Sequence, residues 1–502
     1  MSIIFYFFHK KINLFYALIF QLCLLTIIPY QTEAQMFLTD ELHDSYHNYK
    51  ENNLTNKRFN YNELLTYLKP FGENDVFVRR EIGSSLEGRK IIMLSFGKGP
   101  VDVVAWSQMH GDESTATMAL IDILKFLAAN DNFNDFRKLL SEKLTLHFIP
   151  MLNPDGAERF QRRNALDIDL NRDALRLEYP ESKALKSVQD SLKPQFGFNL
   201  HDQDLRYTAG KTYKSATISI LAPAFNKEKE INSIRSDAMK VIVNMVEELS
   251  KFIPGHIARY DDEFEPRAFG DNFAKWGTGT ILIESGGWKN NFEKQFLREL
   301  NFIGLLVSFQ SIAEQKYIEA DLTKYNNIPE NKKYLFDLLL PNLKREYNSQ
   351  MYTLDIGINH SERSYNNSRD DYYRGTIDDM GDLSTFYGYE EINCEGMVVK
   401  EGKTYPDVFN DISDLENVNF LDLYEAGYTS VRVKQVEKNI DFTNYPIMVL
   451  SNETSYKSRI KLNSLADLVI YKENKVRFVV INGFIFDLLS GKNTILNGLI
   501  IR

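Results

Sequence analysis

Short apolar runs alternate with longer amphipathic stretches in the first two thirds of the chain. The runs Val103 to Trp106, Leu144 to Met151 and Phe196 to Leu200 are apolar over most of their length, which is typical of strands buried on both faces of a sheet. Between the first two runs, Thr115 to Ala128 repeats leucine and isoleucine at helical spacing and predicts a helix packed on that sheet. Strands that alternate with long helices predict an α/β domain.

The same pattern continues to about residue 316. Further strands are predicted at 75–82, 90–97, 217–221 and 280–283, and further helices at 230–252 and 292–312. In open α/β sheets, ligands gather at the ends of strands. The polar residues that follow the predicted strands are therefore the candidates for catalysis and ligand binding.

The pattern changes beyond about Tyr317. Asp- and Asn-rich turns alternate with short β-type runs at 396–400, 430–436, 447–451, 468–471 and 477–486, and a helical stretch near 331–346 is a candidate linker. We find no repeat and no catalytic motif in this part of the sequence. The chain is therefore predicted to hold an α/β domain over 35–316, followed by a β-rich accessory region of unknown role over 317–502.

The first 34 residues predict a secretory signal peptide. An apolar, aromatic-rich segment, Phe15 to Tyr30, follows Lys10 and Lys11, and small residues occupy the −3 and −1 positions of a cleavage site after Ala34. The apolar segment is short for a membrane span, and no later segment matches it. We therefore expect an exported protein, periplasmic or secreted, with no stable membrane span.

Composition narrows the range of partners. The 502 residues predict two or three domains, and the formal charge of −10 becomes −11 when Lys10, Lys11 and Glu33 leave with the signal peptide (−10 − 2 + 1). This acidic balance, without a basic tract, argues against nucleic acid as a partner.

Cys394 is the only cysteine left after processing, so no intramolecular disulfide can form, and stability must come from the cores or a bound metal.

The first candidate metal ligands lie in His110-Gly111-Asp112-Glu113, which follows the predicted strand at 103–106. An imidazole and a carboxylate three residues apart can turn toward one point, and together they suit a divalent metal such as zinc. Taken alone, the same stretch also fits a helix-capping loop with a solvated histidine. A metal site requires a third ligand, a base and a group that holds the substrate.

Further motifs follow at predicted strand ends. They are, in order, Asn153-Pro154-Asp155-Gly156, Arg162-Arg163-Asn164, Asp169-Leu170-Asn171-Arg172-Asp173, His201-Asp202, and Glu284 before Ser285-Gly286-Gly287. In this order the sequence resembles the M14 zinc carboxypeptidases, the carboxypeptidase A-like metallopeptidases. The resemblance spans about 101–287 and leaves out the accessory region. It implies the fold of that family, a mixed and largely buried sheet flanked by helices.

The resemblance and the chemistry of the side chains imply the same metal site. His110, Glu113 and His201 would bind one zinc ion per chain and leave a fourth position open for water. Zinc would lower the pKa of that water and polarise the scissile carbonyl. Glu284 would act as the general base that takes a proton from the water and passes it to the leaving amine.

The resemblance also implies the residues that bind substrate. Arg172 with Asn171 would hold the free C-terminal carboxylate of a peptide, a contact that distinguishes an exopeptidase from an endopeptidase. Arg162 would polarise the scissile carbonyl, with the adjacent Arg163 as the alternative. Tyr260 would cap the substrate, although its spacing to the general base departs from that of the family.

Four other positions have separate interpretations. Asp173 stands where the family usually has asparagine and adds a negative charge beside the carboxylate clamp, and Arg267 would favour an acidic or diaminopimelate-like side chain. Asp202 is a candidate for orienting an imidazole. We expect Asp112 to cap the following helix rather than to bind metal.

The leading hypothesis is therefore an exported zinc metallocarboxypeptidase, a hydrolase that acts on peptides with a free C-terminal carboxylate. A peptidoglycan stem-peptide amidase or deacylase on the same scaffold is the alternative. A second alternative, from a different class, is a non-catalytic binding protein in which the accessory region does the work. The sequence does not indicate an oligomeric state.

Overall fold

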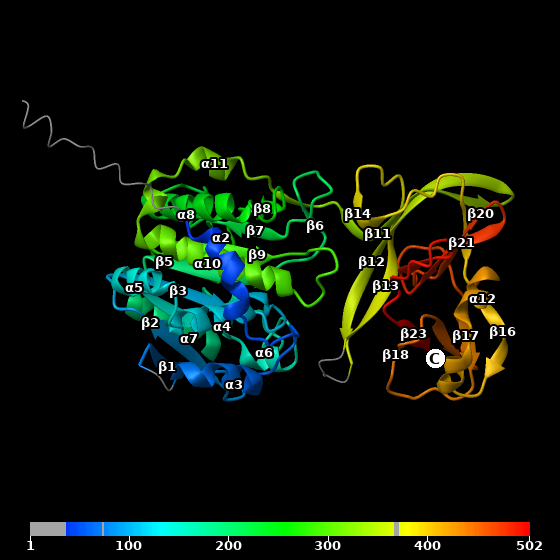
Figure 1. Ribbon diagram of the computed structural model, residues 1–502, viewed down its shortest axis with the longest axis horizontal. Coiled ribbons are helices and arrows are strands. Elements are labelled where there is room, and N and C mark those ends of the chain that lie inside the picture. Colours follow the sequence, from blue (N-terminus) through cyan, green and yellow to red (C-terminus); the bar gives the residue numbers. More distant parts are fainter. Residues whose placement is uncertain (1–36, 73–74, 366–370) are drawn as a thin grey trace, which may run out of the picture. The chain divides into compact units, whose positions relative to one another are not determined.

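The computed structural model describes residues 37–72, 75–365 and 371–502 (Figure 1). The predicted signal peptide lies outside the described residues. Residues Thr39–Arg502 form one compact unit, in which an α/β part is followed along the chain by a strand-rich part. This order confirms the predicted fold class.

An eight-stranded mixed sheet forms the centre of the α/β part, with the strand order β1-β2-β4-β3-β5-β9-β7-β8. Its strands are β1 (Phe77–Ser84), β2 (Lys90–Phe96), β3 (Val101–Ser107), β4 (Leu144–Ile149), β5 (Phe196–Asp202), β7 (Ile218–Leu221), β8 (Ile257–Arg259) and β9 (Gly279–Ser285). The central strands β4, β3, β5 and β9 are parallel, whereas β1, β2 and β7 pair antiparallel with their neighbours toward the centre. Every strand predicted before residue 316 is present.

The helices of the α/β part are α2 (Thr39–Ser45), α3 (Tyr61–Gly72), α4 (Thr115–Ala128), α5 (Asn134–Lys143), α6 (Pro154–Glu158), α7 (Pro180–Leu192), α8 (Ser233–Leu249), α9 (Phe269–Lys275) and α10 (Gln295–Ala313). The predictions at 115–128, 230–252 and 292–312 correspond to α4, α8 and α10. Sequence analysis did not predict α5 and α7, because both are mostly polar and bury only part of their length.

Helices cover both faces of the sheet. On one face, Trp106 of β3 packs on Phe273 of α9, with ring centroids 4.4 Å apart. On the other face, Phe198 of β5 meets Phe309 of α10 at 5.5 Å. Because side chains alternate along a strand, a sheet covered on both faces needs strands that are apolar throughout, as the sequence pattern predicted.

Helix α4 is buried around almost its whole circumference, not along one stripe as predicted. It packs against both the sheet and α10. Asp122 of α4 and Arg298 of α10 form a fully buried ion pair in which Nε of Arg298 donates to Oδ2 of Asp122 at 2.6 Å. The hydroxyl of Tyr46 donates to the same carboxylate at 2.8 Å. A charged residue in the helix is therefore part of the core.

Among the described residues, α10 is the one helix long and apolar enough to cross a membrane. Its most apolar stretch is 89% buried inside the protein. A core helix has this combination of length, composition and burial, because it must be apolar on every side that neighbouring elements cover.

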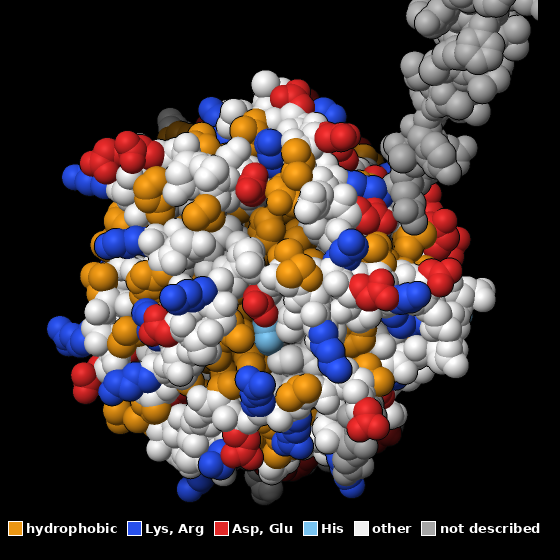
Figure 2. Space-filling view, turned by 90° about the vertical axis from the view of Figure 1, so that its left-hand side faces the viewer, with side chains coloured by type: hydrophobic (Ala, Val, Ile, Leu, Met, Phe, Trp, Pro, Cys, Tyr) orange, Lys and Arg blue, Asp and Glu red, His pale blue; other side chains and the backbone are white. Residues whose placement is uncertain are grey.

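The surface of the α/β part carries both signs of charge. Lys and Arg side chains are interspersed with Asp and Glu on the face shown in Figure 2. Apolar side chains lie between them on the same face. Mixed charge of this kind favours solubility without creating a strong field of one sign.

The strand-rich part contains two sheets. The larger comprises β11 (Leu335–Tyr347), β12 (Gln350–Ser364), β13 (Asp371–Gly381), β14 (Tyr387–Glu391), β15 (Val398–Glu401), β20 (Leu468–Lys472), β21 (Lys475–Ile481) and β22 (Phe484–Asp487). The smaller comprises β16 (Lys403–Phe409), β17 (Tyr428–Val433), β18 (Phe442–Thr443), β19 (Met448–Ser451) and β23 (Gly498–Ile501), with α12 (Phe420–Glu425) beside it. The prediction of a β-rich region is confirmed.

The predicted helical linker at 331–346 is wrong, because this segment forms β10 (Asn331–Lys333) and β11. Leu335, Leu338 and Leu339 have helical spacing, but β11 pairs with β12 on one side and with β14 on the other. Pairing with strands that are distant in sequence decides the conformation of such a short apolar run.

The larger sheet begins later than the predicted boundary at 317. The hydroxyl of Tyr325, in α11 (Leu322–Asn326), accepts the backbone N–H of Ala222 at 3.0 Å. Strand β10 pairs with β6 (Tyr207–Ala209). Residues up to about 333 thus pack with the α/β part, and the strand-rich part starts at β11.

Candidate metal centre and substrate cavity

Three neighbouring parallel strands bring the candidate residues to one edge of the sheet. Strands β3, β5 and β9 lie side by side, so their carboxyl ends meet. His110 and Glu113 follow β3, His201 lies near the end of β5, and Glu284 lies opposite His201 in β9. The topology explains how residues distant in sequence share one site.

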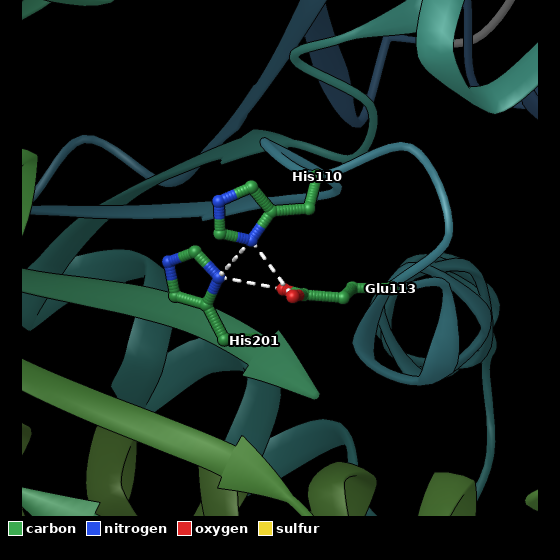
Figure 3. Close-up of side chains that lie close together, drawn as sticks. All are labelled: His110, Glu113 and His201. Carbon is green, nitrogen blue, oxygen red and sulfur yellow. Dashed lines mark hydrogen bonds and ion pairs between the residues drawn. The ribbon is translucent and has the colours of Figure 1, made fainter. Parts of the chain in front are cut away.

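The three predicted metal ligands converge (Figure 3). Nδ1 of His110 lies 2.7 Å from Oε1 of Glu113, Nδ1 of His201 lies 2.6 Å from Oε2 of Glu113, and the two Nδ1 atoms are 3.1 Å apart. One donor atom from each residue lies within 4.8 Å of the others, and all three side chains are buried. Two imidazole nitrogens and a carboxylate in this arrangement fit a zinc ion.

Glu113 is ionised although it is buried. Burial alone would raise the pKa of Glu113, but the imidazoles of His110 and His201 outweigh this effect and hold the pKa well below its ordinary value. The site therefore presents a negative charge between two imidazoles, as a divalent cation requires.

The loop that carries His110 and Glu113 is held against α6. A Cβ on Gly111 would lie 2.0 Å from the backbone carbon of Gly156, so only glycine permits this approach. Asn153 caps α6 by accepting the N–H of Gly156 at 2.9 Å, and its amide donates to the carbonyl of Met109 at 3.2 Å. The Asn-Pro-Asp-Gly motif, which the sequence indicates only as a turn, thus positions the ligand loop.

Asp169 fixes the ring of His110. Its Oδ1 lies 3.1 Å from Nε2 of His110, the ring nitrogen that does not contact Glu113. A carboxylate on the outer nitrogen sets the tautomer and orientation of a metal-binding histidine. Sequence analysis gave Asp169 no role, and its position two residues before Asn171 in the motif was the available signal.

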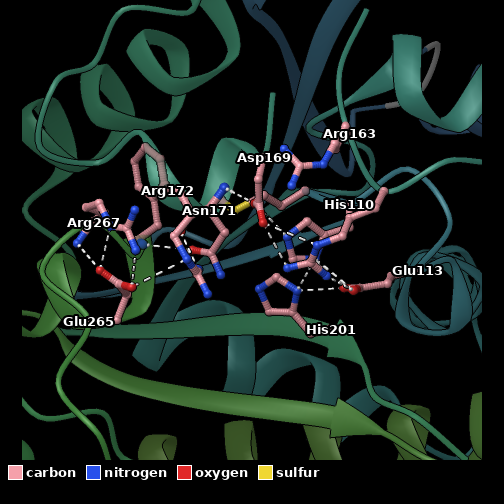
Figure 4. A network of polar contacts seen from close by, with 12 residues as sticks. His110, Glu113, Arg163, Asp169, Asn171, Arg172, His201, Glu265 and Arg267 are labelled. Atoms are coloured by element: carbon pink, nitrogen blue, oxygen red, sulfur yellow. Dashed lines mark hydrogen bonds and ion pairs between the residues drawn. The ribbon is translucent and has the colours of Figure 1, made fainter. Parts of the chain in front are cut away.

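Arg162 reaches the metal centre and Arg163 does not. Nη1 of Arg162 donates to Oε1 of Glu113 at 3.1 Å, and its Nη2 donates to Oδ2 of Asp169 at 3.1 Å. Arg163 is exposed and donates to the backbone carbonyl of Asp167 at 2.9 Å (Figure 4). Of the two alternatives, only Arg162 contacts a candidate metal ligand.

Asp202 does not orient an imidazole, contrary to the interpretation from sequence. Adjacent side chains on a strand point to opposite faces, so His201 and Asp202 diverge. Oδ2 of Asp202 accepts the hydroxyl of Thr115 at 2.5 Å and lies 3.7 Å from Nζ of Lys294. The orienting contact comes from Asp169 and acts on the other histidine.

Asp112 does not cap α4, so the predicted capping role is wrong. The helix begins at Thr115 with Ser114 as its N-cap, which places Asp112 outside the first turn. The hydroxyl of Ser114 donates to the carbonyl of Lys57 at 2.5 Å instead of capping the helix. Burial, with the charge of Glu113, raises the pKa of Asp112 to about 6.

Asn171 and Arg172 lie in the same network as the metal centre (Figure 4). Oδ1 of Asn171 accepts the backbone N–H of Phe269 at 2.9 Å. Nη1 of Arg172 donates to the carbonyl of Asn171 at 2.7 Å, and its Nε lies 3.5 Å from Oε2 of Glu265. Because 40% of its side chain is exposed, Arg172 is accessible to a substrate carboxylate. Such a carboxylate would compete with Glu265 for the guanidinium.

The negative charge of Asp173 is directed away from this arginine. Its carboxylate is buried and accepts the backbone N–H groups of Glu178 at 3.2 Å and Tyr179 at 3.1 Å. The aspartate therefore stabilises the loop before α7.

Glu284 lies close enough to Tyr260 to influence the ionisation of the phenol. Burial and the charge of Glu113 raise the pKa of Glu284 well above its ordinary value. The carboxylate of Glu284, together with burial, raises the pKa of the Tyr260 phenol. Both residues therefore belong to the site that contains the metal ligands.

One cavity of about 480 Å³ contains the predicted site residues. The eight residues that line it as predicted are His110, Glu113, Arg162, Asn171, Arg172, His201, Tyr260 and Glu284. Sequence analysis missed other lining residues, among them Asn199, Glu265 and Asp271. Arg267 does not line the cavity and pairs with Glu265 at 2.7 Å, with 56% of its side chain exposed.

Two buried imidazoles and a carboxylate at the carboxyl edge of a mixed α/β sheet match the donor set of catalytic zinc sites. Residues 71–216 match the family model of zinc carboxypeptidases. The matched segment contains six of the eight predicted site residues, and Tyr260 and Glu284 lie beyond it.

Individual relatives match a similar portion of the chain. A probable carboxypeptidase 2 of Arthroderma benhamiae is 31% identical over 160 residues, which cover 30% of this chain and 29% of that protein. Carboxypeptidase SOL1 of Arabidopsis thaliana is 27% identical over 147 residues, which cover 26% and 27% of the two chains. The chain thus spans under a third of the length of these relatives. A metallo-carboxypeptidase structure from Burkholderia cenocepacia aligns with a TM-score of 0.43 at 15% identity, covering 51% of this chain and 70% of that one.

Proposed function

We propose that the protein is an exported zinc metallocarboxypeptidase that hydrolyses the last peptide bond of substrates with a free C-terminal carboxylate. The observation that carries this proposal is the single cavity in which the ligand set, Glu284 and Arg172 all lie. The M14 segment and the convergence of the three ligands support it.

One zinc ion per chain would be held by His110, Glu113 and His201. When bound, zinc supplies a Lewis acid that lowers the pKa of a water molecule and polarises the scissile carbonyl. Asp169 holds the ring of His110, and Arg162 holds the carboxylate of Glu113, so the ligands are arranged before a metal enters.

Glu284 is the proposed general base. Its carboxylate takes a proton from the attacking water and gives that proton to the nitrogen of the leaving residue. Arg162 would stabilise the negative charge that develops on the carbonyl oxygen.

Exopeptidase selectivity would come from Arg172 and Asn171. The guanidinium of Arg172 can bind a carboxylate through two parallel hydrogen bonds, which an internal peptide bond cannot accept in the same way. Tyr260, which lines the same cavity, would close over the bound residue.

Export is proposed from the sequence of the first 34 residues. The full chain expressed in a bacterial host should be recovered outside the cytoplasm with Gln35 as its first residue, as determined by mass spectrometry. Recovery of a cytoplasmic chain that still begins at Met1 would contradict export without affecting the proposed chemistry.

The proposed chemistry is tested by Glu284→Gln. The variant should bind one equivalent of zinc, and its kcat on a blocked dipeptide should fall by about 10²–10⁴-fold, the usual contribution of a general base. The matched control is Glu228→Gln, at an exposed position, which should keep wild-type turnover. Unchanged turnover in Glu284→Gln would remove this residue as the base. Failure of the wild type to bind stoichiometric zinc would contradict the metal site and favour a binding protein.

A further inference from the structure

A cavity separate from the metal centre lies in the strand-rich part of the chain. Its volume is about 660 Å³, and it shares no described residue with the cavity that holds the metal ligands. Its walls come from the edge strand β13, from residues in the segment 455–465 between β19 and β20, and from β23 with the residue after it (Figure 1). A cavity of this size can hold an organic ligand and is larger than a single ion needs.

Hydrogen bonds hold the walls of this cavity together. The backbone N–H of Asn463 donates to the carbonyl of Ile377 at 2.8 Å, and the N–H of Ile377 donates to the carbonyl of Ser464 at 3.0 Å. The side chain of Asn497, the residue before β23, accepts the N–H of Tyr373 at 2.9 Å and donates to its carbonyl at 3.0 Å. Strand β13 is therefore bonded to the other two walls, and the cavity is formed before a ligand enters.

Positive charge exceeds negative charge among the residues that line this cavity. Its charged lining residues within the described chain are Asp441, Arg374, Lys457, Arg459 and Arg502. Asp441 pairs with Arg502 at 2.8 Å, and we find no described carboxylate paired with the other three cations. A chain with a formal charge of −10 thus places three unpaired cations around one cavity, where their combined field attracts an anion.

Tyr372 and Tyr456 add neutral hydrogen-bond donors beside these cations. Burial raises the pKa of both phenols, and the charge of Arg374 acts on the pKa of both in the opposite sense, which places its guanidinium near each of them. Neither hydroxyl bonds to a described residue. The ring of Tyr372 is stacked on Phe442 with centroids 5.1 Å apart, so its position is fixed. The cavity therefore offers donors to charged and to uncharged oxygen atoms.

We propose that this cavity binds an acidic saccharide, a sugar that carries carboxylate or phosphate groups. Arg374 and Arg459 can each bind such a group through two parallel hydrogen bonds, and Lys457 binds it as a point charge. The phenols of Tyr372 and Tyr456 donate to sugar hydroxyls.

The neutral donors favour a saccharide over an acidic peptide. A sugar presents hydroxyl oxygens next to its acid groups, whereas a peptide separates its side-chain carboxylates from its backbone by flexible methylene groups. Binding at this cavity would hold the protein on an acidic glycan and leave the peptidase cavity free. The inference does not depend on the proposed function.

The first test is calorimetry on the full-length, zinc-loaded protein at low ionic strength, where surface charges are least screened. The probes are trigalacturonate, which carries carboxylates, and fructose 1,6-bisphosphate, which carries phosphates. At least one should bind at least about tenfold tighter than the neutral maltotriose, the equivalent of one charge-assisted hydrogen bond. The probe that binds tighter identifies the acid group.

Two further probes separate this ligand class from others. They are inorganic phosphate and triglutamate blocked at both ends, which has no free C-terminus for the peptidase cavity. Either of them bound as tightly as the better acidic sugar would overturn the assignment to a saccharide. Binding of neither acidic sugar would overturn the proposal as a whole.

Substitutions place the binding in this cavity. Arg374→Gln and Lys457→Gln should each weaken binding of the better acidic sugar by about tenfold. Both residues are exposed and lie outside the peptidase cavity, so Tm and the kcat/KM for a blocked dipeptide should stay at wild-type values. Lys475→Gln, exposed in β21 and outside both cavities, is the matched control and should bind the sugar as the wild type does. Wild-type affinity in both Arg374→Gln and Lys457→Gln would contradict the site.

Discussion

Single residues outside the proposed set of metal ligands position the residues within it. Asp169 contacts the outer nitrogen of His110 at 3.1 Å and also accepts two hydrogen bonds from Arg162. Burial would raise the pKa of Asp169, but His110 and Arg162 outweigh this and hold it well below its ordinary value, so the contact is that of an ionised carboxylate. His110 is thereby fixed in the orientation that directs Nδ1 toward Glu113.

Replacing this carboxylate by a neutral amide tests the positioning role. Asp169→Asn should weaken zinc binding by about 10–100-fold, because the amide no longer fixes the tautomer and orientation of His110. The measurement is a competition with a chromophoric chelator. Asp167→Asn, in the same loop but exposed, is the control and should bind zinc as the wild type does. Equal affinity in both variants would show that His110 does not depend on Asp169.

At the scale of elements, α4 and α10 are joined by a buried ion pair. Arg298 and Asp122 are both fully buried, and Asp122 also accepts the hydroxyl of Tyr46 and the backbone N–H of Glu51 at 2.8 Å each. Helix α4 follows the ligand loop directly, so its anchoring supports the position of Glu113.

Removing one partner of this pair should be costly. Arg298→Met leaves the carboxylate of Asp122 buried without its cation and should lower the free energy of unfolding by about 3–5 kcal/mol, measured by urea denaturation. The double variant Asp122→Leu with Arg298→Met removes both charges and should recover much of the loss. A single variant within about 1 kcal/mol of wild type would mean that the pair adds little to the core.

The sequence predicted those elements in which the pattern of buried side chains is uniform along the whole element. Strands β3, β4 and β5 are covered on both faces and are therefore apolar over most of their length, which makes them recognisable in the sequence. Strand β11 was misread because three leucines at helical spacing also fit a strand in the interior of a sheet. The run 477–486 was read as one strand, although Asn482 (φ 50°) and Gly483 (φ 80°) form a tight turn between β21 and β22.

The order of the motifs along the sequence identified the predicted site residues. Spacing indicated the three ligands and the base because each follows or ends a central parallel strand. Spacing did not indicate the roles of Asp169 and Asp202. A carboxylate contacts one imidazole or another according to the strand face from which it projects and the path of the loop that carries it. The cavity residues Glu265 and Asp271 were also missed, because no motif includes them and only the fold brings them to the cavity.

At the scale of the whole molecule, the cavity is built by the α/β part. The described residues that line it come from elements up to β10, which contributes Asn331, whose amide donates to Oε1 of Gln203 at 3.0 Å. The strands from β11 onward supply no lining residue to this cavity within the described chain. The residues to which we assign carboxypeptidase chemistry therefore all come from the α/β part.

In the proposed mechanism, Arg172 and Asn171 hold a free C-terminus while Glu284 and the metal centre act on the bond before it. The most direct measurement is kcat/KM of the zinc-loaded protein for one peptide prepared as the free acid and as the C-terminal amide. The free acid should be cleaved at least about 100-fold faster, because the amide cannot form the paired charge-assisted hydrogen bonds with Arg172. Equal rates for the acid and the amide would contradict the account.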